Sequence, residues 1–375
     1  MLSTAAIVNS FPLAAVVAKI SSILLALLGF TVIVLVHEFG HFIFCKLFGV
    51  KTPTFSIGMG PVIVSKKIGE TEFCLSSIPI GGYLEIAGQA EPGQGSQEHA
   101  ASTENFSFTS KSYWQQALIL TGGVMFNLFF AYFAYTTILW KGFPSTIYKN
   151  IKVERIVEES PAEKEGILKG DLITGIEGKA FINMDDAPAF FAKTISESAN
   201  KKIDFTILRD GDKKRFSIAI GKKDERGFLG CGYAWDRSRG KPQSHSIKES
   251  LTKSFSMMTA QVFAVLSVLK HLITTRDLSA VGGPVMMLTQ TTRVASEGII
   301  FLILFLAFIS VNLAVINMLP IAALDGGQLL FLTIEAIIRR PLPEKVRLYI
   351  NVVSWGFLLF LMLLFTYKDI VRIWF

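Results

Sequence analysis

The sequence predicts a polytopic α-helical membrane protein with about four transmembrane helices, a membrane-associated β-hairpin and strand region, and one extramembrane α+β domain. Three observations lead to this fold class. Of the 375 residues, 51% are hydrophobic. Several runs of about 20 residues, the length that a bilayer requires, carry almost no charge. About half of the charged residues fall between Lys149 and Lys241, so a water-soluble domain is expected there.

The net charge of +7 does not indicate a nucleic-acid partner, because the basic residues are interleaved with acids rather than gathered in a stripe. A modest attraction to anionic lipid accounts for it. The cysteines, Cys45, Cys74 and Cys231, are scattered and odd in number, so they predict no disulfide framework.

Residues 1–48 predict the first transmembrane helix, which runs from about Val17 to Phe48. No charged residue occurs between Ile20 and Val36. The N-terminus lacks the basic region of a signal peptide, and the apolar run leads directly into a polar motif. We therefore expect a retained membrane helix.

The polar motif is His37-Glu38-Phe39-Gly40-His41, which has the pattern H-E-x-x-H. Residues four apart lie on one helix face, so His37 and His41 can bind one metal ion together. Glu38 is placed to take a proton from a metal-bound water. The alternative is a set of polar core residues that neighbouring helices satisfy. Cys45 lies ~12 Å along the helix axis from His37, too far for a shared zinc ion, and is expected to be a buried apolar residue.

Residues 49–115 predict a loop with a β-hairpin, in which 62–65 and 72–75 flank a turn at 67–70. A further short strand is expected over 78–86, where the glycine pair Gly81-Gly82 indicates close approach of another backbone. The alternative is a plain third strand of a small sheet.

Residues 116–140 predict the second transmembrane helix. It contains Thr121-Gly122-Gly123 and Asn127, which favour close helix packing and an interhelical hydrogen bond. We interpret both as packing features, with contact to the H-E-x-x-H motif as the alternative.

Residues 145–242 predict the soluble domain. Ser160-Pro161-Ala162-Glu163 is typical of a capped helix start, and Arg209-Asp210-Gly211-Asp212 of a hairpin turn. Residues 243–297 predict an amphipathic linker, in which 254–272 either lies along the membrane or enters it.

Residues 298–338 predict the third transmembrane helix, interrupted near Asn317-Met318-Leu319-Pro320, and 339–375 predict a basic loop and the fourth helix. The basic residues between Arg339 and Arg347 place that loop in the cytoplasm. The soluble domain then lies outside the cytoplasm, and loop 49–115 lies inside it.

A catalytic zinc ion usually has three protein ligands, so a third remains to be found. Asp325 is the best candidate, because it lies in an apolar stretch beside glycines and has no neighbouring base. Glu335 and Glu297 are weaker, since they lie nearer to polar ends. The alternative for Asp325 is a helix N-cap.

Together, His37–His41 and the segment Asn317–Pro320 with Leu324-Asp325-Gly326 resemble the site-2 protease family of intramembrane zinc metalloproteases, and most closely its bacterial regulator-of-sigma-E protease branch. Segment 160–173 resembles part of a PDZ domain, so the soluble domain is expected to be PDZ-like. Further segments similar to this branch are Phe55–Pro61, Ile78–Tyr83 and Gly283–Val285.

The resemblance implies that His37, His41 and Asp325 hold Zn²⁺ and that Glu38 is the catalytic base. It also implies a set of residues that bind the backbone of the substrate. These are Asn317 and the strand edge formed by Gly81, Gly82, Tyr83 and Leu84. Two features depart from the family: Ala322 stands where a second proline is usual, and the soluble segment has room for one PDZ domain where some relatives carry two.

The predicted function is cleavage of transmembrane segments of single-pass membrane proteins, as the second cut of regulated intramembrane proteolysis. Anti-sigma factors or signal-peptide remnants are the expected substrates. The alternatives are an inactive membrane scaffold that binds peptides through the PDZ-like domain, and a metal carrier. The expected location is the bacterial inner membrane, with the PDZ-like domain on the extracytoplasmic side and the active site toward the cytoplasm. Expected partners are transmembrane substrates, the lipid bilayer and a ligand of the PDZ-like domain.

Overall fold

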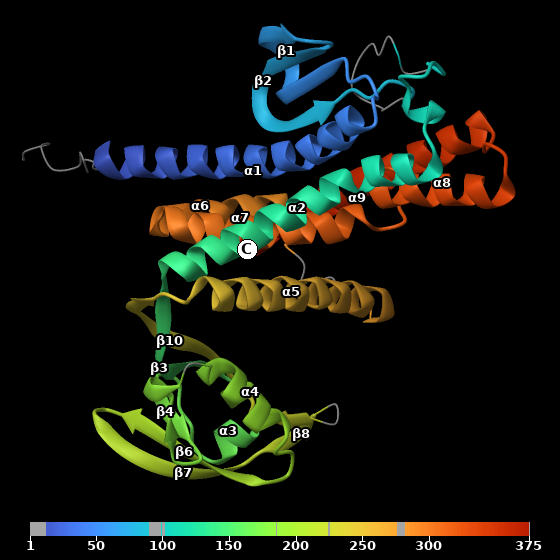
Figure 1. The fold of residues 1–375 in the computed structure, drawn as a ribbon. Helices are drawn as coiled ribbons and strands as arrows, with labels where there is room; N and C mark the ends of the chain where they lie inside the picture. The colour runs from blue at the N-terminus through green and yellow to red at the C-terminus, as the bar shows by residue number, and fades with distance from the viewer. Residues whose placement is uncertain are drawn as a thin grey trace, which may run out of the picture. The chain divides into compact units, whose positions relative to one another are not determined.

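The computed structural model describes residues 13–89, 99, 102–184, 186–223, 226–275 and 282–374, so the first twelve residues of segment 1–48 lie outside it. The chain divides into two compact units, which we describe separately (Figure 1). The first contains Met1–Lys141 and His245–Phe375, and the second contains Gly142–Ser244.

Helices dominate the first unit. Those described are α1 (Leu13–Leu47), α2 (Tyr113–Lys141), α5 (Ile247–Thr275), α6 (Pro284–Glu297), α7 (Ile299–Asn317), α8 (Asp325–Ile338) and α9 (Glu344–Trp374), with a short 3-10 turn at Phe108–Ser110. Within the described residues, five segments are long and apolar enough to cross a membrane. They are Ile20–Leu47, Tyr113–Lys141, Ile247–Thr275, Ile299–Asn317 and Lys345–Arg372. This is one more than the four predicted.

The additional helix is α5. The sequence located its apolar part at 254–272, but the helix extends by several residues at both ends. Near its middle, Gln261 forms hydrogen bonds with both neighbouring helices. Tyr135 of α2 donates to Gln261 Oε1 at 2.7 Å, and Gln261 Nε2 donates to the Phe308 carbonyl of α7 at 2.7 Å. α5 is thus fixed against α2 and α7.

α1 and α2 run antiparallel and meet at glycines. A Cβ added to Gly40 would lie 2.2 Å from the Gly122 carbonyl oxygen, closer than any side chain permits. α7 runs parallel to α1, since Gly29 of α1 lies against Leu306 and His37 lies beside Asn317. The small residues in α2 therefore have the predicted packing role, which lets two helix backbones touch.

β1 (Thr54–Ile68) and β2 (Thr71–Leu84) form the predicted hairpin with its turn at Gly69. The separate strand expected over 78–86 is instead the continuation of β2. Gly81 has φ +82°, a value that favours glycine, and beyond it the strand turns back along the start of β1. Ser56 consequently pairs twice, once with Cys74 and once with Tyr83.

The predicted helix over 298–338 is two helices. α7 ends at Asn317, and α8 begins at Asp325 after a short turn. The first turn of α8 rests on this connection: a Cβ at Gly326 would lie 2.4 Å from the Met318 carbonyl, and one at Gly327 would lie 2.1 Å from the Ile321 carbonyl. The glycines after Asp325 therefore hold the start of α8 against the turn.

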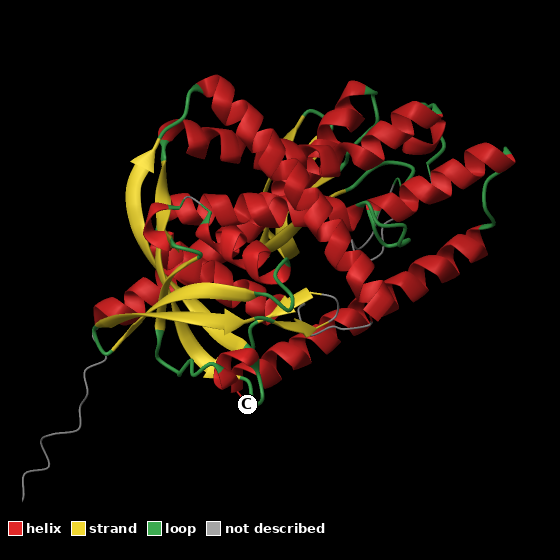
Figure 2. Cartoon of the chain, turned by 90° about the horizontal axis from the view of Figure 1, so that it is seen from below, coloured by secondary structure: helices red, strands yellow, loops and turns green. Residues whose placement is uncertain are grey.

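The second unit is an α+β domain (Figure 2). Its main sheet has the order β10-β3-β4-β6-β7, with β5 paired to β4. The strands are β3 (Phe143–Ile156), β4 (Leu172–Ile176), β5 (Lys179–Ala180), β6 (Lys202–Arg209), β7 (Asp212–Ala219) and β10 (Cys231–Gln243), beside the small pair β8 (Gly221–Lys223) and β9 (Arg226–Phe228). The helices are α3 (Pro161–Lys164) and α4 (Ala187–Ser196), with a 3-10 turn at Phe181–Asn183.

Two local predictions for this unit are confirmed. Ser160 caps α3 by accepting from the Glu163 N–H, and Glu163 in turn accepts from the Glu159 N–H. The hairpin of β6 and β7 turns at Asp210-Gly211. The core of the domain is aromatic and aliphatic, with Phe181, Phe191 and Phe205 almost fully buried.

One ion pair is buried in this domain. Asp171, which is 2% exposed, accepts hydrogen bonds from Arg209 Nε and Nη2, both at 2.7 Å, and from the Leu168 N–H at 2.9 Å. Burial alone would raise the pKa of Asp171. The hydrogen bonds from Arg209 and Leu168, together with the charge of Arg209, outweigh it and hold the pKa below its usual range.

Candidate metal centre

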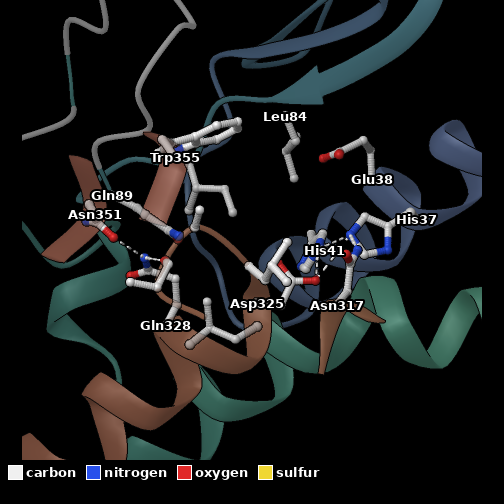
Figure 3. Close-up of a pocket in the computed structure, with 15 residues that line it drawn as sticks. His37, Glu38, His41, Leu84, Gln89, Asn317, Asp325, Gln328, Asn351 and Trp355 are labelled. Carbon is white, nitrogen blue, oxygen red and sulfur yellow. Dashed lines mark hydrogen bonds and ion pairs between the residues drawn. The ribbon is translucent and has the colours of Figure 1, made fainter. Parts of the chain in front are cut away.

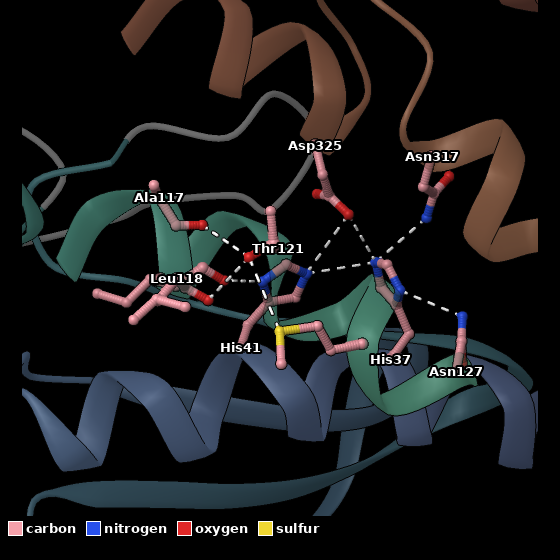
Figure 4. A network of polar contacts seen from close by, with 10 residues as sticks. His37, His41, Ala117, Leu118, Thr121, Asn127, Asn317 and Asp325 are labelled. Atoms are coloured by element: carbon pink, nitrogen blue, oxygen red, sulfur yellow. Dashed lines mark hydrogen bonds and ion pairs between the residues drawn. The ribbon is translucent and has the colours of Figure 1, made fainter. Parts of the chain in front are cut away.

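The predicted ligands His37, His41 and Asp325 meet at one point (Figure 4). His37 Nε2 lies 3.1 Å from Asp325 Oδ2 and 3.3 Å from His41 Nε2, and His41 Nε2 lies 3.6 Å from the same aspartate oxygen. Both histidines are buried. Three potential metal-ligand atoms therefore face a common centre, although Asp325 lies nearly 290 positions after the two histidines in the chain.

Local structure explains the convergence. His37 and His41 are one helical turn apart on α1, so their rings project from the same face. Asp325 is the first residue of α8, and the break after α7 turns it toward α1. The N-cap residue of α8 is Leu324, and no side-chain cap hydrogen bond is made there. The alternative role of Asp325 as an N-cap is therefore wrong.

The α2 backbone leaves room for the two imidazoles. A Cβ at Gly123 would lie 2.4 Å from His41 Nε2 and 2.5 Å from His37 Cε1. Gly123 therefore touches the site, which is the alternative to a pure packing role for the small residues of this helix. Any side chain at this position would displace a predicted ligand.

The donor set fits a zinc ion. Nitrogen and carboxylate ligands lie ~2.0–2.2 Å from tetrahedral zinc, which places neighbouring ligand atoms ~3.3–3.6 Å apart. The three separations of 3.1, 3.3 and 3.6 Å are close to this value. Asp325 Oδ2 is also buried without a hydrogen-bond partner among the described residues, although both imidazoles lie within ion-pair distance. A cation at the common centre would satisfy it.

A cavity of about 230 Å³ opens beside the three residues (Figure 3). The predicted base Glu38 and the predicted substrate residues Asn317 and Leu84 line it. Gly81, Gly82 and Tyr83 are not among its lining residues. The cavity thus brings together the end of α7, the start of α8, the H-E-x-x-H segment of α1 and the end of β2.

The far wall of this cavity was not predicted. It consists of polar and aromatic side chains from the loop after β2, from α8 and from α9, namely Gln89, Gln328, Asn351 and Trp355. None of them belongs to a recognisable sequence motif, and only the fold shows that each lines the same cavity as the predicted ligands. A signal for two of them was an amide next to apolar residues, at Gln328 and Asn351.

Gln328 also explains the segment around Ala322. Its Nε2 donates to the Ala322 carbonyl at 2.6 Å, and its Oε1 accepts from Arg347 of α9 at 3.2 Å. The turn that precedes Asp325 is therefore held by the side chain of Gln328. This side chain binds the backbone of Ala322, which stands where a second proline is usual in the family.

The end of β2 presents one edge to β1 and the other away from it. The Glu85 N–H donates to the Thr54 carbonyl at 2.8 Å. Since alternate residues of a strand point the same way, the Tyr83 N–H also faces β1, at Ser56, and the Gly82 and Leu84 N–H groups face the opposite side. No other strand in the described part of the chain pairs with β2.

The other acids and the cysteine considered as ligands lie elsewhere. Cys45 is fully buried in an apolar cluster, as predicted. Glu335 accepts from the Leu342 N–H at 3.0 Å and lies 3.9 Å from Arg347. Neither it nor Glu297 belongs to the group around His37.

Most of the chain is similar in sequence to known proteins. The model of "Peptidase family M50" matches residues 25–361. Two relatives, each named "Putative zinc metalloprotease", are 30% identical to this chain: one from Clostridium perfringens, covering 93% of this chain and 98% of its own, and one from Helicobacter pylori, covering 93% and 99%. Among solved structures, the PDZ domain of an SdrC-like protein from Listeria monocytogenes aligns with 23% of this chain and 90% of its own at 20% identity, with a TM-score of 0.21.

Proposed function

This chain belongs to peptidase family M50, the family of the site-2 proteases, and we propose that it cuts peptide bonds of transmembrane segments in single-pass membrane proteins. The observation that carries the proposal is the meeting of His37, His41 and Asp325 beside Glu38 in one cavity between membrane-type helices. Zinc is the cofactor of this family's relatives by name, and the donor set suits it.

In the proposed mechanism, His37, His41 and Asp325 hold zinc. When bound, zinc supplies Lewis-acid chemistry, which activates water and polarises the scissile carbonyl. Glu38 follows His37 on the same helix and lines the cavity, with its carboxylate directed toward Leu84 (Figure 3). It accepts the proton of the attacking water and donates a proton to the leaving amine.

The substrate must lie extended for its peptide bonds to be reached, because a transmembrane helix hides them in its own hydrogen bonds. The outward edge at Gly82 and Leu84 offers replacement partners by β-augmentation. Asn317 lies 3.2 Å from His37 Nε2 and borders the same cavity, so its amide can bind the substrate backbone close to the scissile bond.

The parallel course of α1 and α7 supports four membrane crossings. If α5 crossed the membrane alone after α2, α7 would begin on the opposite side and run antiparallel to α1. α6, with 14 residues, spans only ~21 Å and cannot supply a second crossing. We therefore propose that α1, α2, α7 and α9 cross, and that α5 lies in or along the membrane without completing a crossing.

The side of each segment follows from the same reasoning. The basic loop at 339–347 places the end of α7, and with it the metal ligands, toward the cytoplasm. The second unit, which connects α2 and α5, then lies outside the cytoplasm. The proposed location is the bacterial inner membrane.

The proposed role is the second cut of regulated intramembrane proteolysis, made after another protease has removed the outer domain of the substrate. The PDZ-like unit would bind a peptide or exclude substrates whose outer domains are still present. A catalytically inactive scaffold is disfavoured, because Glu38 beside a metal-binding group has no use in peptide binding alone.

The test is to express the full chain with single-pass membrane proteins whose outer domains have been removed, and to compare it with Glu38→Gln. The native chain should yield cut transmembrane segments. Glu38→Gln should bind zinc normally and cut at least ~10²-fold more slowly, since only proton transfer is lost. Equal cutting by both proteins would refute the role of Glu38, and zinc binding without any cutting by the native chain would favour the scaffold.

A further inference from the structure

Asn127 is a polar residue in the apolar helix α2. Its exposed fraction is zero, and it lies 90 positions from His37 in the chain. Its side-chain Nδ2 is 3.3 Å from His37 Nδ1 (Figure 4). A buried amide within a membrane helix is costly unless its hydrogen bonds are made, so the partner that Asn127 finds in His37 needs an explanation.

The geometry of His37 determines what it needs from this neighbour. Its Nε2 faces Asp325 and His41, and is therefore the atom that would bind zinc. A ring nitrogen that binds a metal must offer its lone pair, which leaves the ring hydrogen on Nδ1. That hydrogen points at Asn127 and requires an acceptor.

We propose that Asn127 is a positioning residue that accepts the Nδ1 hydrogen of His37 through its side-chain oxygen when zinc is bound. A half turn of the amide exchanges its two ends. This turn brings to His37 the Oδ1 atom, which is buried and has no hydrogen-bond partner among the residues described. The inference rests on the proposed zinc site and adds a second layer of contacts to it.

His41 has the same arrangement with a different acceptor. Its Nδ1 lies 2.7 Å from the backbone carbonyl oxygen of Ile119, which can only accept. Both histidines therefore direct Nε2 to the metal and Nδ1 to α2. The difference is that a carbonyl is present whatever residue stands at 119, whereas the acceptor for His37 depends on the side chain at 127.

The backbone of Asn127 is itself held in place. Ser310 of α7 donates from its hydroxyl to the Asn127 carbonyl oxygen at 2.9 Å, and is fully buried. This bond fixes α2 to α7 without involving the amide of Asn127. Ser310 therefore provides a control position: its removal disturbs the packing near Asn127 but leaves the contact with His37.

The experiment measures zinc affinity of the purified full-length protein by competition with a chelator, for the native chain and for Asn127→Asp, Asn127→Leu and Ser310→Ala. Asn127→Leu should weaken zinc binding ~10–100-fold, the usual effect of losing an outer contact of a metal-bound histidine. Asn127→Asp keeps the acceptor and should bind zinc at least as tightly as the native chain. Ser310→Ala should leave the affinity unchanged.

Thermal unfolding of the metal-free proteins separates a folding defect from a binding defect. The absorption spectrum of the cobalt-substituted protein provides a second measurement, which should change in Asn127→Asp and stay the same in Ser310→Ala. Equal zinc affinity of the native chain and Asn127→Leu would overturn the inference, as would equal losses in Asn127→Asp and Asn127→Leu. Failure of the native chain to bind zinc would instead overturn the proposed function.

Discussion

Asp325 of the first unit and Asp171 of the second each have a carboxylate oxygen that is buried away from water, but they differ in the hydrogen bonds that their neighbours supply. Asp171 receives three hydrogen bonds, two of them from the fork of Arg209, and its charge is balanced inside the domain. Asp325 faces two imidazoles within ion-pair distance, and its Oδ2 has no hydrogen-bond partner among the described residues.

We interpret this as the difference between a structural carboxylate and one that could bind a metal ion. A buried ion pair with all its hydrogen bonds made needs nothing further. A carboxylate with one buried, unpartnered oxygen that shares a centre with two imidazoles is an arrangement that a cation would complete. Substitutions at the two carboxylates and at the groups around them test this distinction.

The first prediction concerns removal of the Asp325 carboxylate, which has an oxygen without a hydrogen-bond partner among the described residues. Asp325→Ala should lose bound zinc and all measurable cutting, because two imidazoles alone hold zinc weakly. The measurement is metal content of the purified protein, about one zinc per native chain. Glu335→Ala is the matched control on the same helix and should keep its zinc. Full zinc occupancy in Asp325→Ala would show that the third ligand lies elsewhere.

The second prediction concerns the strand edge beside the metal centre. Leu84→Pro removes an N–H that faces away from β1, so cutting should fail while zinc stays bound. Tyr83→Pro removes an N–H that faces Ser56, so it should lower thermal stability through the hairpin. Cleavage, zinc content and thermal stability are measured for both. Native cutting by Leu84→Pro would mean that the substrate is unwound by other means.

The third prediction removes the second unit. Replacing 150–240 by a short flexible linker should leave the zinc content unchanged, because every predicted ligand lies in the first unit. The shortened chain should also cut substrates that still carry their outer domains. The comparison is the ratio of cutting of untrimmed to trimmed substrate. An unchanged ratio would show that the domain serves another role, such as docking a partner.

The fourth prediction concerns the ion pair of Arg209 with Asp171. Arg209→Met leaves Asp171 buried without its main partner and should destabilise the second unit by about 3 kcal/mol. Chemical denaturation followed by tryptophan fluorescence of Trp235 measures this. Lys193→Met, in the exposed pair with Glu197, should cost less than ~0.5 kcal/mol. Zinc content should not change in either variant.

The fifth prediction is a pH dependence of the second unit. The folded-state pKa of Asp171 lies below the ~3.9 of an unfolded chain, so the folded domain binds fewer protons between these two values. This contribution is present above pH ~3.9 and is lost as the pH falls through the folded-state pKa. Denaturation midpoints between pH 6 and about pH 2 should show this loss in the native chain. A loss of equal size in Asp171→Asn would assign it to other carboxylates.

Much of the metal centre could be predicted from the sequence, because its parts have fixed local geometry. The spacing of His37 and His41 determines that they share a helix face, and Asp325 was the best third candidate by its place beside glycines in an apolar stretch. The resemblance to a known family supported that choice. Membership of family M50 confirms that resemblance. The hairpin and the capped turn at Ser160 were also predicted, since each depends on neighbouring residues alone.

What the sequence could not show depends on contacts between distant segments. Asn127 reaches His37 only because α1 and α2 touch at glycines, so its role as more than a packing residue was left open. Gln89 and Trp355 face the cavity through the path of a loop and of α9. The separate strand at 78–86 was wrong because a positive φ at Gly81 bends one strand where the pattern indicated two.

The contact of Gly40 with Gly122 and the position of Gly123 have a consequence for how this protein can evolve. The spacing of the ligands from α2 depends on backbone atoms, which have no rotamers. Outward residues such as Phe39 and Phe129, both exposed, can therefore be exchanged for other apolar residues without moving the histidines. We expect tolerance to random substitution to be high on these outer faces and absent at the three glycines, where a single methyl group is too large.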